Sequence, residues 1–119
     1  MFDDTQPIYQ QIAQQVRDQV LTGELSPGQQ VMSTTQYALT YKINPATAAK
    51  AFALLVNEGV LEKRRGIGMF VTASAKSKLQ LQQREQFFAE TFAKTLWRAS
   101  LLDISQEELI AAINAKYQA

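Results

Sequence analysis

The strongest constraint on the fold is the short interval between two helical segments, followed by a change of hydrophobic period. The segment INPATAAKAFALLVNEG, residues 43–59, begins with an Asn that can cap a helix and a Pro that fits the first turn. The helical segment STTQYALTYK, residues 33–42, lies directly before it. From Gly59 on, the apolar residues follow an extended pattern, in GVLE and MFV on either side of a glycine-bearing turn. Two closely joined helices and a hairpin indicate a winged helix-turn-helix.

Helical periods predict what the core of this domain contains. Apolar residues recur every four positions in the first helix, which we expect to begin near Pro7 with Thr5 as its cap and to end at Gly23. Val31 and Met32 are expected to form a very short strand. The residues assigned to the core are Ile8, Ile12, Val16, Val20, Ala38, Leu39, Ala48, Ala51, Phe52 and Leu55.

The rest of the chain has the pattern of two further helices. The small polar stretch TASAKS, residues 72–77, predicts a boundary between the winged helix-turn-helix domain, residues 1–75, and a two-helix tail, residues 76–119. A break is expected at residues 102–104, and Ser105 with the Glu three positions later forms a capping box. An apolar stripe on these helices predicts dimerisation, since a pair of helices can hardly bury it. The residues assigned to dimerisation are Leu81, Phe88, Phe92, Leu96, Trp97, Leu101, Leu109 and Ile113.

Composition excludes several classes of function. The 119 residues contain neither Cys nor His, which removes disulfides, thiolate catalysis, the commonest general base and the commonest metal ligand. No nucleophile–base set or phosphate-binding loop appears, so we predict no enzyme activity, no metal and no cofactor. The start MFDDTQPIYQ lacks the pattern of a signal peptide, and no apolar run is long enough to cross a membrane. We therefore expect a cytoplasmic protein without a membrane partner.

Charge is distributed unevenly along a chain whose net charge is only +1. Residues 31–72 carry five basic and two acidic side chains, whereas residues 1–30 carry one basic and four acidic side chains. A local basic patch indicates contact with a polyanion, although an ordinary solvated face would show the same charges. In the setting of a winged helix-turn-helix we favour double-stranded DNA as the partner.

The residues expected to contact DNA belong to three places in the sequence. The exposed face of the third helix offers side chains to base edges, and the basic wing offers charges to phosphates, with glycines that permit close approach. The start of the second helix can donate to phosphate, although Ser33 acting only as a helix cap is an equal alternative. The residues assigned to DNA binding are Ser33, Thr34, Thr35, Asn44, Ala46, Thr47, Lys50, Lys63, Arg64, Arg65, Gly66 and Gly68.

These segments resemble the GntR family of bacterial transcription regulators. PIYQQIAQQVRDQVLTGELSPGQQV is similar to the opening of such proteins, and INPATAAKAFALLVNEGVLEKRRGIGMFV closely resembles the YtrA-like branch. The resemblance implies a homodimer on an inverted-repeat operator, which represses an operon that often encodes a transporter. It also implies that any small-molecule effector, of unknown identity, would need a small site, because too few residues follow the wing to enclose a ligand-binding domain.

Three departures from the family pattern bear on how strongly one subunit binds. Thr35 and Ala49 stand where many relatives have arginine, and the wing has Ile67 and Met69 where a basic residue and a threonine are common. Such a protein is expected to depend on two linked subunits for its affinity. The rival hypotheses are a winged helix that binds protein without DNA, and a small ligand-binding or enzymatic domain.

Overall fold

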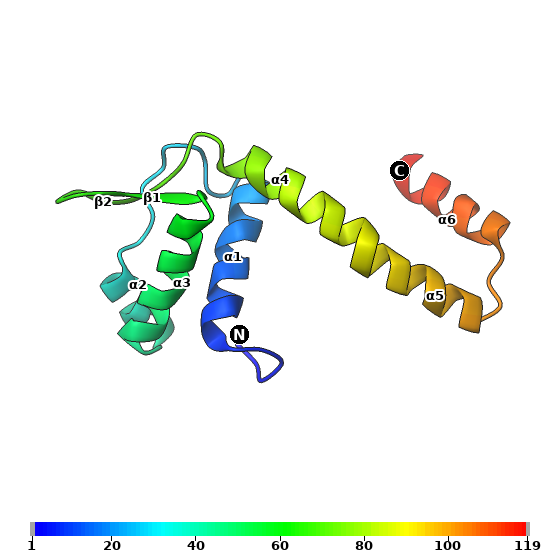
Figure 1. The fold of residues 1–119 in the computed structure, drawn as a ribbon, viewed down its shortest axis with the longest axis horizontal. Coiled ribbons are helices and arrows are strands. Elements are labelled where there is room, and N and C mark those ends of the chain that lie inside the picture. The colour runs from blue at the N-terminus through cyan, green and yellow to red at the C-terminus, as the bar shows by residue number, and fades with distance from the viewer. Residues whose placement is uncertain (1, 119) are drawn as a thin grey trace. The chain divides into compact units, whose positions relative to one another are not determined.

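The computed structural model describes residues 2–118 and is mainly helical, with one two-stranded antiparallel sheet. The chain divides into two compact units, one up to Leu81 and one from Gln82 on. The helices are α1 (Ile8–Thr22), α2 (Thr34–Tyr41), α3 (Pro45–Asn57), α4 (Ala75–Gln86), the π-helical turn η1 (Phe87–Phe92), α5 (Ala93–Leu101) and α6 (Gln106–Gln118), and the strands are β1 (Leu61–Arg64) and β2 (Gly68–Val71) (Figure 1). The predicted fold class, a winged helix-turn-helix with a helical tail, is confirmed.

Both helices of the helix-turn-helix begin at caps that the sequence predicts. The Ser33 hydroxyl accepts a hydrogen bond from the Gln36 amide at 3.1 Å, and the Asn44 side chain accepts one from the Ala46 amide at 2.8 Å. Between them α2 ends at Lys42, whose φ of 56° lies in the left-handed region. The prediction of Thr5 as the cap of α1 is wrong, because Pro7 precedes that helix and the Thr5 hydroxyl bonds to the Asp3 carboxylate.

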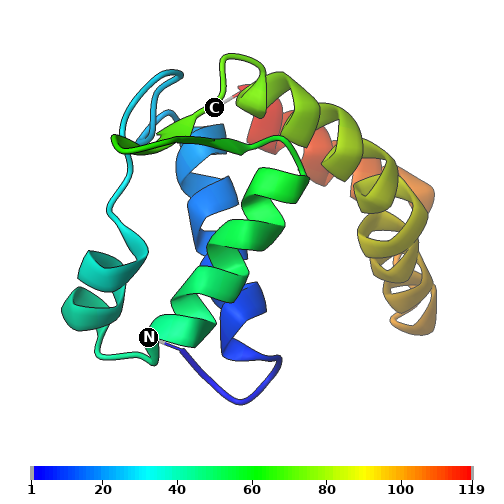
Figure 2. The ribbon, with the colours of Figure 1, turned by 60° about the vertical axis from the view of Figure 1, so that its left-hand side comes forward.

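The core of the first unit lies where α1, α2 and α3 pack together. Helices α1 and α3 lie side by side in both ribbon views, and α2 packs against α3 (Figures 1 and 2). The predicted core is confirmed except for Leu39, which is 76% exposed, and Ile8 packs against the core cluster while staying half-buried. Tyr37 takes the core position expected of Leu39, because its ring packs against Tyr41 and Phe52.

Tyr37 also carries a buried hydroxyl into this core. Burial, followed by the nearby Tyr41, raises the pKa of Tyr37 to about 12. The hydroxyl therefore stays protonated at neutral pH and donates to Oε1 of Gln15 at 3.2 Å. This bond ties α2 to α1, and it satisfies a polar group that would otherwise be costly to bury.

The wing is the hairpin of β1 and β2, in which Leu61 pairs with Val71 and Arg64 with Gly68. Its loop has three residues and closes with a bond from the Ile67 amide to the Arg64 carbonyl at 2.9 Å. The strand predicted at Val31 and Met32 appears only as an isolated bridge that joins Gln30 to Phe70. Bonds from the Val31 amide to Met69 and from the Val71 amide to Gln29, both at 2.9 Å, hold this segment on the hairpin.

The segment after the wing contributes to the first unit before the second unit begins. Ala75 and Leu79 of α4 are fully buried within the core cluster of the winged helix. In the second unit, the break predicted at residues 102–104 is present, with Asp103 at a φ of 55°. The Ser105 hydroxyl accepts a bond from the Glu108 amide at 3.1 Å, as half of the predicted capping box. None of the described helices combines the length and the apolar content that a membrane span requires.

Candidate nucleic-acid interface

The exposed face of α3 is the first component of the site. Ala48, Ala51, Phe52 and Leu55 are buried, which turns the opposite side of the helix toward solvent. On that side Lys50 and Ala46 are exposed, and Thr47 is half-buried. The N-terminal half of a recognition helix is the part that enters the major groove, so these residues are placed where base edges could be reached.

Lys50 has an aromatic neighbour that the sequence analysis missed. Its Nζ lies 4.1 Å from the centre of the Tyr9 ring, which belongs to α1. A cation over an aromatic face is attracted by the ring and loses some of its conformational freedom. The contact leaves the three ammonium protons available as donors. Tyr9 thus positions Lys50, and no local pattern could have indicated this pairing across 41 positions of the chain.

The wing carries three consecutive basic side chains, all of them exposed: Lys63, Arg64 and Arg65. They are not equivalent, because Arg64 donates to Oε1 of Glu62 from two nitrogens, at 2.9 and 3.2 Å. The Arg64 guanidinium also lies 4.1 Å from the centre of the Phe70 ring. Lys63 and Arg65 form no ion pair among residues 2–118, so they are the uncompensated charges of the wing.

Each wing glycine meets a different requirement. Gly66 has a φ of 77° in the hairpin loop, a conformation that side chains with a Cβ rarely adopt. At Gly68 a Cβ would lie 2.6 Å from Nε2 of Gln30. That same Nε2 donates to the Ile67 carbonyl at 3.0 Å, which ties the wing to the segment before α2. Gln30 is therefore a second contributor that the sequence analysis missed.

The remaining predicted contacts lie at helix starts. Ser33 and Asn44 both use a side-chain oxygen to cap a helix, so the cap interpretation of Ser33 is confirmed. Contact with phosphate by Ser33, half-buried Thr34 or exposed Thr35 stays a prediction. Asn44 keeps its side-chain amide protons for a further acceptor.

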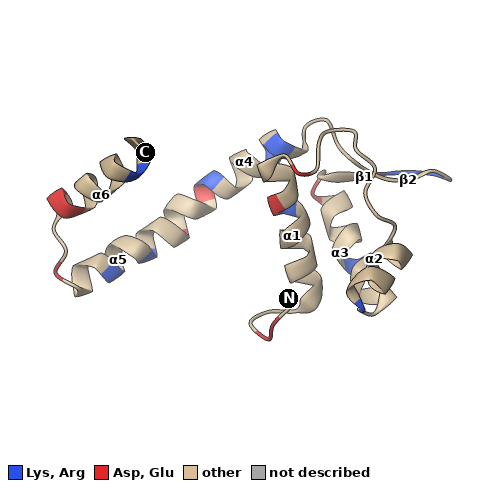
Figure 3. Cartoon of the chain, turned by 180° about the vertical axis from the view of Figure 1, so that it is seen from behind, with Lys and Arg blue, Asp and Glu red and all other residues tan. Residues whose placement is uncertain are grey.

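A surface hollow of about 520 Å³ joins the three elements. Helix α3 supplies an apolar wall, the wing supplies a basic and a glycine position, and the start of α2 supplies hydroxyls. Its lining residues are Ser33, Thr34, Ala49, Ala53, Val56, Lys63, Gly68 and Met69. Figure 3 shows basic residues on the hairpin, on α2 and α3, and also on α1 and α4, while acidic residues lie on the N-terminal segment, on α1 and at the end of α3. The charged residue that lines this hollow is the basic Lys63 of the wing.

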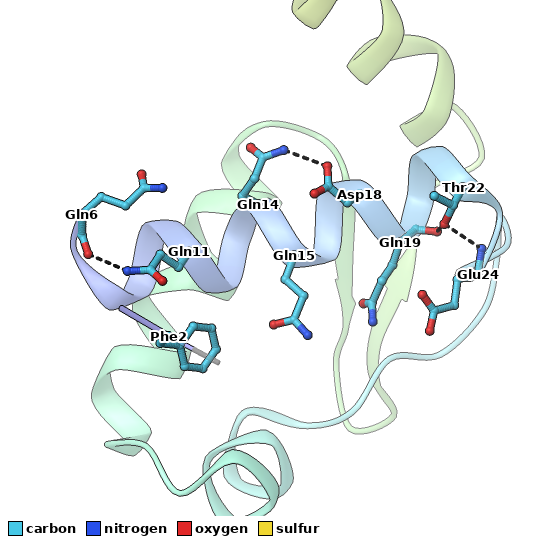
Figure 4. A pocket seen from close by; sticks show the side chains of 9 residues that line it. All are labelled: Phe2, Gln6, Gln11, Gln14, Gln15, Asp18, Gln19, Thr22 and Glu24. Carbon is cyan, nitrogen blue, oxygen red and sulfur yellow. Dashed lines mark hydrogen bonds between the residues drawn. The ribbon is translucent and has the colours of Figure 1, made fainter. Parts of the chain in front are cut away.

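A second, open hollow of about 570 Å³ lies along α1 and has a different character (Figure 4). Glutamine side chains line it together with two acids, Asp18 and Glu24. Several of its polar groups already bond to one another, such as Gln14 to the Asp18 carboxylate at 2.9 Å and Gln11 to the Gln6 carbonyl at 2.7 Å. Its acidic lining makes it unsuitable for a phosphate backbone. Among the described residues, no group of three acidic side chains could hold a metal ion.

The residues predicted for dimerisation occupy the helices after the wing. Six of the eight are strongly exposed, while Phe92 and Leu109 are half-buried. The exposed fractions are 70% for Leu81, 59% for Phe88, 42% for Leu96, 63% for Trp97, 57% for Leu101 and 45% for Ile113. Within the second unit, the Phe88 and Phe92 rings pack edge to face at 5.9 Å.

Comparison with known proteins agrees with this architecture. Residues 8–71 match the family described as bacterial regulatory proteins, gntR family. The HTH-type transcriptional repressor YtrA of Bacillus subtilis is 38% identical over 73 residues, which are 61% of this chain and 56% of that protein. The uncharacterized HTH-type transcriptional regulator YhcF of the same organism is 28% identical over 94% of this chain and 91% of its own length. A GntR family transcriptional regulator from Listeria monocytogenes superposes with a TM-score of 0.79 at 27% identity, over 96% of this chain and 98% of that one.

The chain belongs to the GntR family of bacterial transcription regulators. Its relatives and structural neighbours are transcription regulators rather than enzymes, with a DNA-binding winged helix, and the similarity to YtrA agrees with the branch that the wing motif predicted. The chain spans just over half the length of YtrA itself.

Proposed function

We propose that this protein represses transcription as a homodimer that binds an inverted-repeat operator. Helix α3 enters the major groove, and Lys63 and Arg65 of the wing contact the adjacent phosphates. The observation that carries this proposal is the hollow in which α3, the wing and the start of α2 meet. A sugar-phosphate strand that passes between a recognition helix and a wing would lie in this hollow, with Lys63 beside it.

The homodimer is supported by the apolar surface of the tail. Residues 82–118 expose Phe88, Leu96, Trp97 and Leu101 to solvent and bury only Ala99. An apolar surface of this kind marks an association site. A second copy of the chain fits because a twofold axis through the tails would present two identical recognition helices to an inverted repeat. We include in the proposal the division into a DNA-binding part and a dimerisation tail, with α4 as the connection.

In-vitro selection of random duplex DNA, at two salt concentrations, tests the proposal. The expected result is enrichment of an inverted repeat whose binding weakens with salt, by about 0.9 in the log–log slope for each phosphate contacted. Enrichment of a single half-site would contradict the dimer, and the absence of any salt-sensitive DNA retention would favour the rival hypothesis of a protein-interaction module.

The position of the selected DNA sequence in the genome of origin would identify the regulated genes. The resemblance to the YtrA-like branch leads us to expect a transporter operon and a cytoplasmic site of action. Transcription from the matching promoter, measured with and without the protein, would establish repression. A small-molecule effector would be established by a compound that releases the protein from its operator in the same assay.

A further inference from the structure

The face that α3 offers to DNA is made largely of methyl groups. Ala46, Ala49, Ala53 and Val56 are separated by three, four and three positions, which places them on one stripe of the helix. The three alanines are exposed. Ala49, Ala53 and Val56 line the hollow beside the wing together with Lys63, so this part of the stripe faces a basic residue.

This stripe limits what the helix can read in a major groove. An alanine side chain neither donates nor accepts a hydrogen bond, so it cannot recognise guanine, adenine or cytosine by their polar edges. The feature of the groove that a methyl group can recognise is the C5-methyl of thymine. A short side chain also lets the helix backbone approach the bases closely. Thr47 and Lys50 are the polar residues that flank the stripe in its N-terminal half.

We propose that Ala46 and Ala49 select thymine by contact with its C5-methyl group, so each operator half-site contains thymine at the one or two positions beneath them. The inference rests on the proposed function, since it specifies what the proposed recognition helix reads. Ala49 is exposed in the N-terminal half of α3, which is the part of a recognition helix that enters the major groove. Lys50, held over the Tyr9 ring, supplies a polar contact next to this apolar one.

Deoxyuridine substitution tests the proposal with the unaltered protein. Each thymine of the selected half-sites is replaced in turn by deoxyuridine, which lacks the methyl group and keeps every hydrogen-bonding group. At one or two positions per half-site, the dissociation constant measured by fluorescence anisotropy should rise by about three- to tenfold. The remaining thymines serve as internal controls and should be insensitive. At a sensitive position, 5-methylcytosine should bind better than cytosine, because it restores the methyl group alone.

The Ala49→Arg variant supplies the matched change on the protein side. Arginine can bond to both O6 and N7 of guanine, so the preferred base beneath residue 49 should change from thymine to guanine. The uridine effect at that position should then disappear, while the other half-site positions keep their preferences. Position 49 is exposed and arginine is a good helix former, so the fold should be retained.

The outcomes separate this inference from the proposed function. Sequence-specific binding in which no thymine is sensitive to loss of its methyl group would overturn the inference and leave the DNA-binding function intact. A selected half-site without thymine would do the same. Failure to enrich any sequence would overturn both.

Discussion

The two units of the chain use their apolar side chains in opposite ways. In the first unit Ile12, Phe52 and Leu55 are almost completely buried, and each is held by a helix with a defined end. Across residues 82–118 most of the large apolar side chains are exposed, and Ala99 is the one buried residue. The first unit therefore has a core that can stabilise it, whereas the second has a surface that needs a partner.

The largest effect that would sharpen this comparison is expected from Phe52→Ala. The ring is 1% exposed and packs against Tyr37 at 5.5 Å between centroids, so its removal leaves a cavity at the junction of α2 and α3. We expect about 3–5 kcal/mol of destabilisation, measured by urea unfolding of the full chain. Phe88→Ala removes the same ring from an exposed position and serves as the control for unfolding of the first unit. Equal destabilisation by the two variants would contradict the contrast between a buried core and an exposed apolar surface.

The next largest effect is expected on dimer formation, in a variant whose free energy of unfolding stays unchanged. Trp97→Ala removes a large exposed ring from the proposed dimer surface. Because buried aromatic residues dominate interfaces, we expect the dimer dissociation constant to rise by about 30-fold, which corresponds to about 2 kcal/mol. Sedimentation over a range of concentrations measures it. Leu39→Ala, an exposed apolar residue of the first unit, is the matched control and should leave association unchanged.

Local chemistry explains why so much of the first unit could be predicted from its sequence. Ser33 and Asn44 cap helices through bonds to residues two or three positions away, and such short-range bonds leave a signature in the sequence. The failure at Leu39 has a tertiary cause. An eight-residue helix has little periodic signal, and the contact of Tyr37 with Phe52 decides which of its faces is buried.

The parts of the site that escaped prediction depend on register and on packing. Glu62 and Arg64 lie on one face of β1, and Phe70 joins them only because it pairs with Glu62 across the hairpin. Tyr9 and Lys50 belong to helices brought together by the core. The sequence indicated the charge of the wing, but not that its three basic residues would differ in how they are paired.

A smaller effect is expected from the uncompensated charges of the wing. The double variant Lys63→Ala, Arg65→Ala should lower affinity for specific and random DNA alike, on the order of tenfold, and should reduce the salt slope by about 0.9 for each phosphate that is no longer neutralised. Lys94→Ala with Lys116→Ala removes the same charge from the second unit and is the control. An unchanged salt slope in the wing variant would refute phosphate contact by these residues.

The smallest effect, and the one most specific to the structure, concerns Glu62. Its carboxylate bonds to Arg64 at 2.9 Å and adds a negative charge to a surface proposed to face phosphates. Glu62→Gln removes that charge at nearly constant shape, so we expect DNA affinity to rise a few-fold and the salt slope to steepen as Arg64 becomes available. Stability should hardly change, because the pair is about half exposed, at 47% and 48%. Glu85→Gln in α4 is the charge control.

The opposite outcome for Glu62→Gln would also be informative about the wing. A fall in affinity would mean that Glu62, together with the Phe70 ring, holds Arg64 in the orientation that DNA requires. The two roles can be separated by the salt slope. Removal of repulsion steepens it, whereas misorientation of an arginine that binds phosphate flattens it by about 0.9 per subunit. A wing in which one arginine is restrained by its own strand, beside two unrestrained cations, would then combine a fixed contact with two adaptable ones.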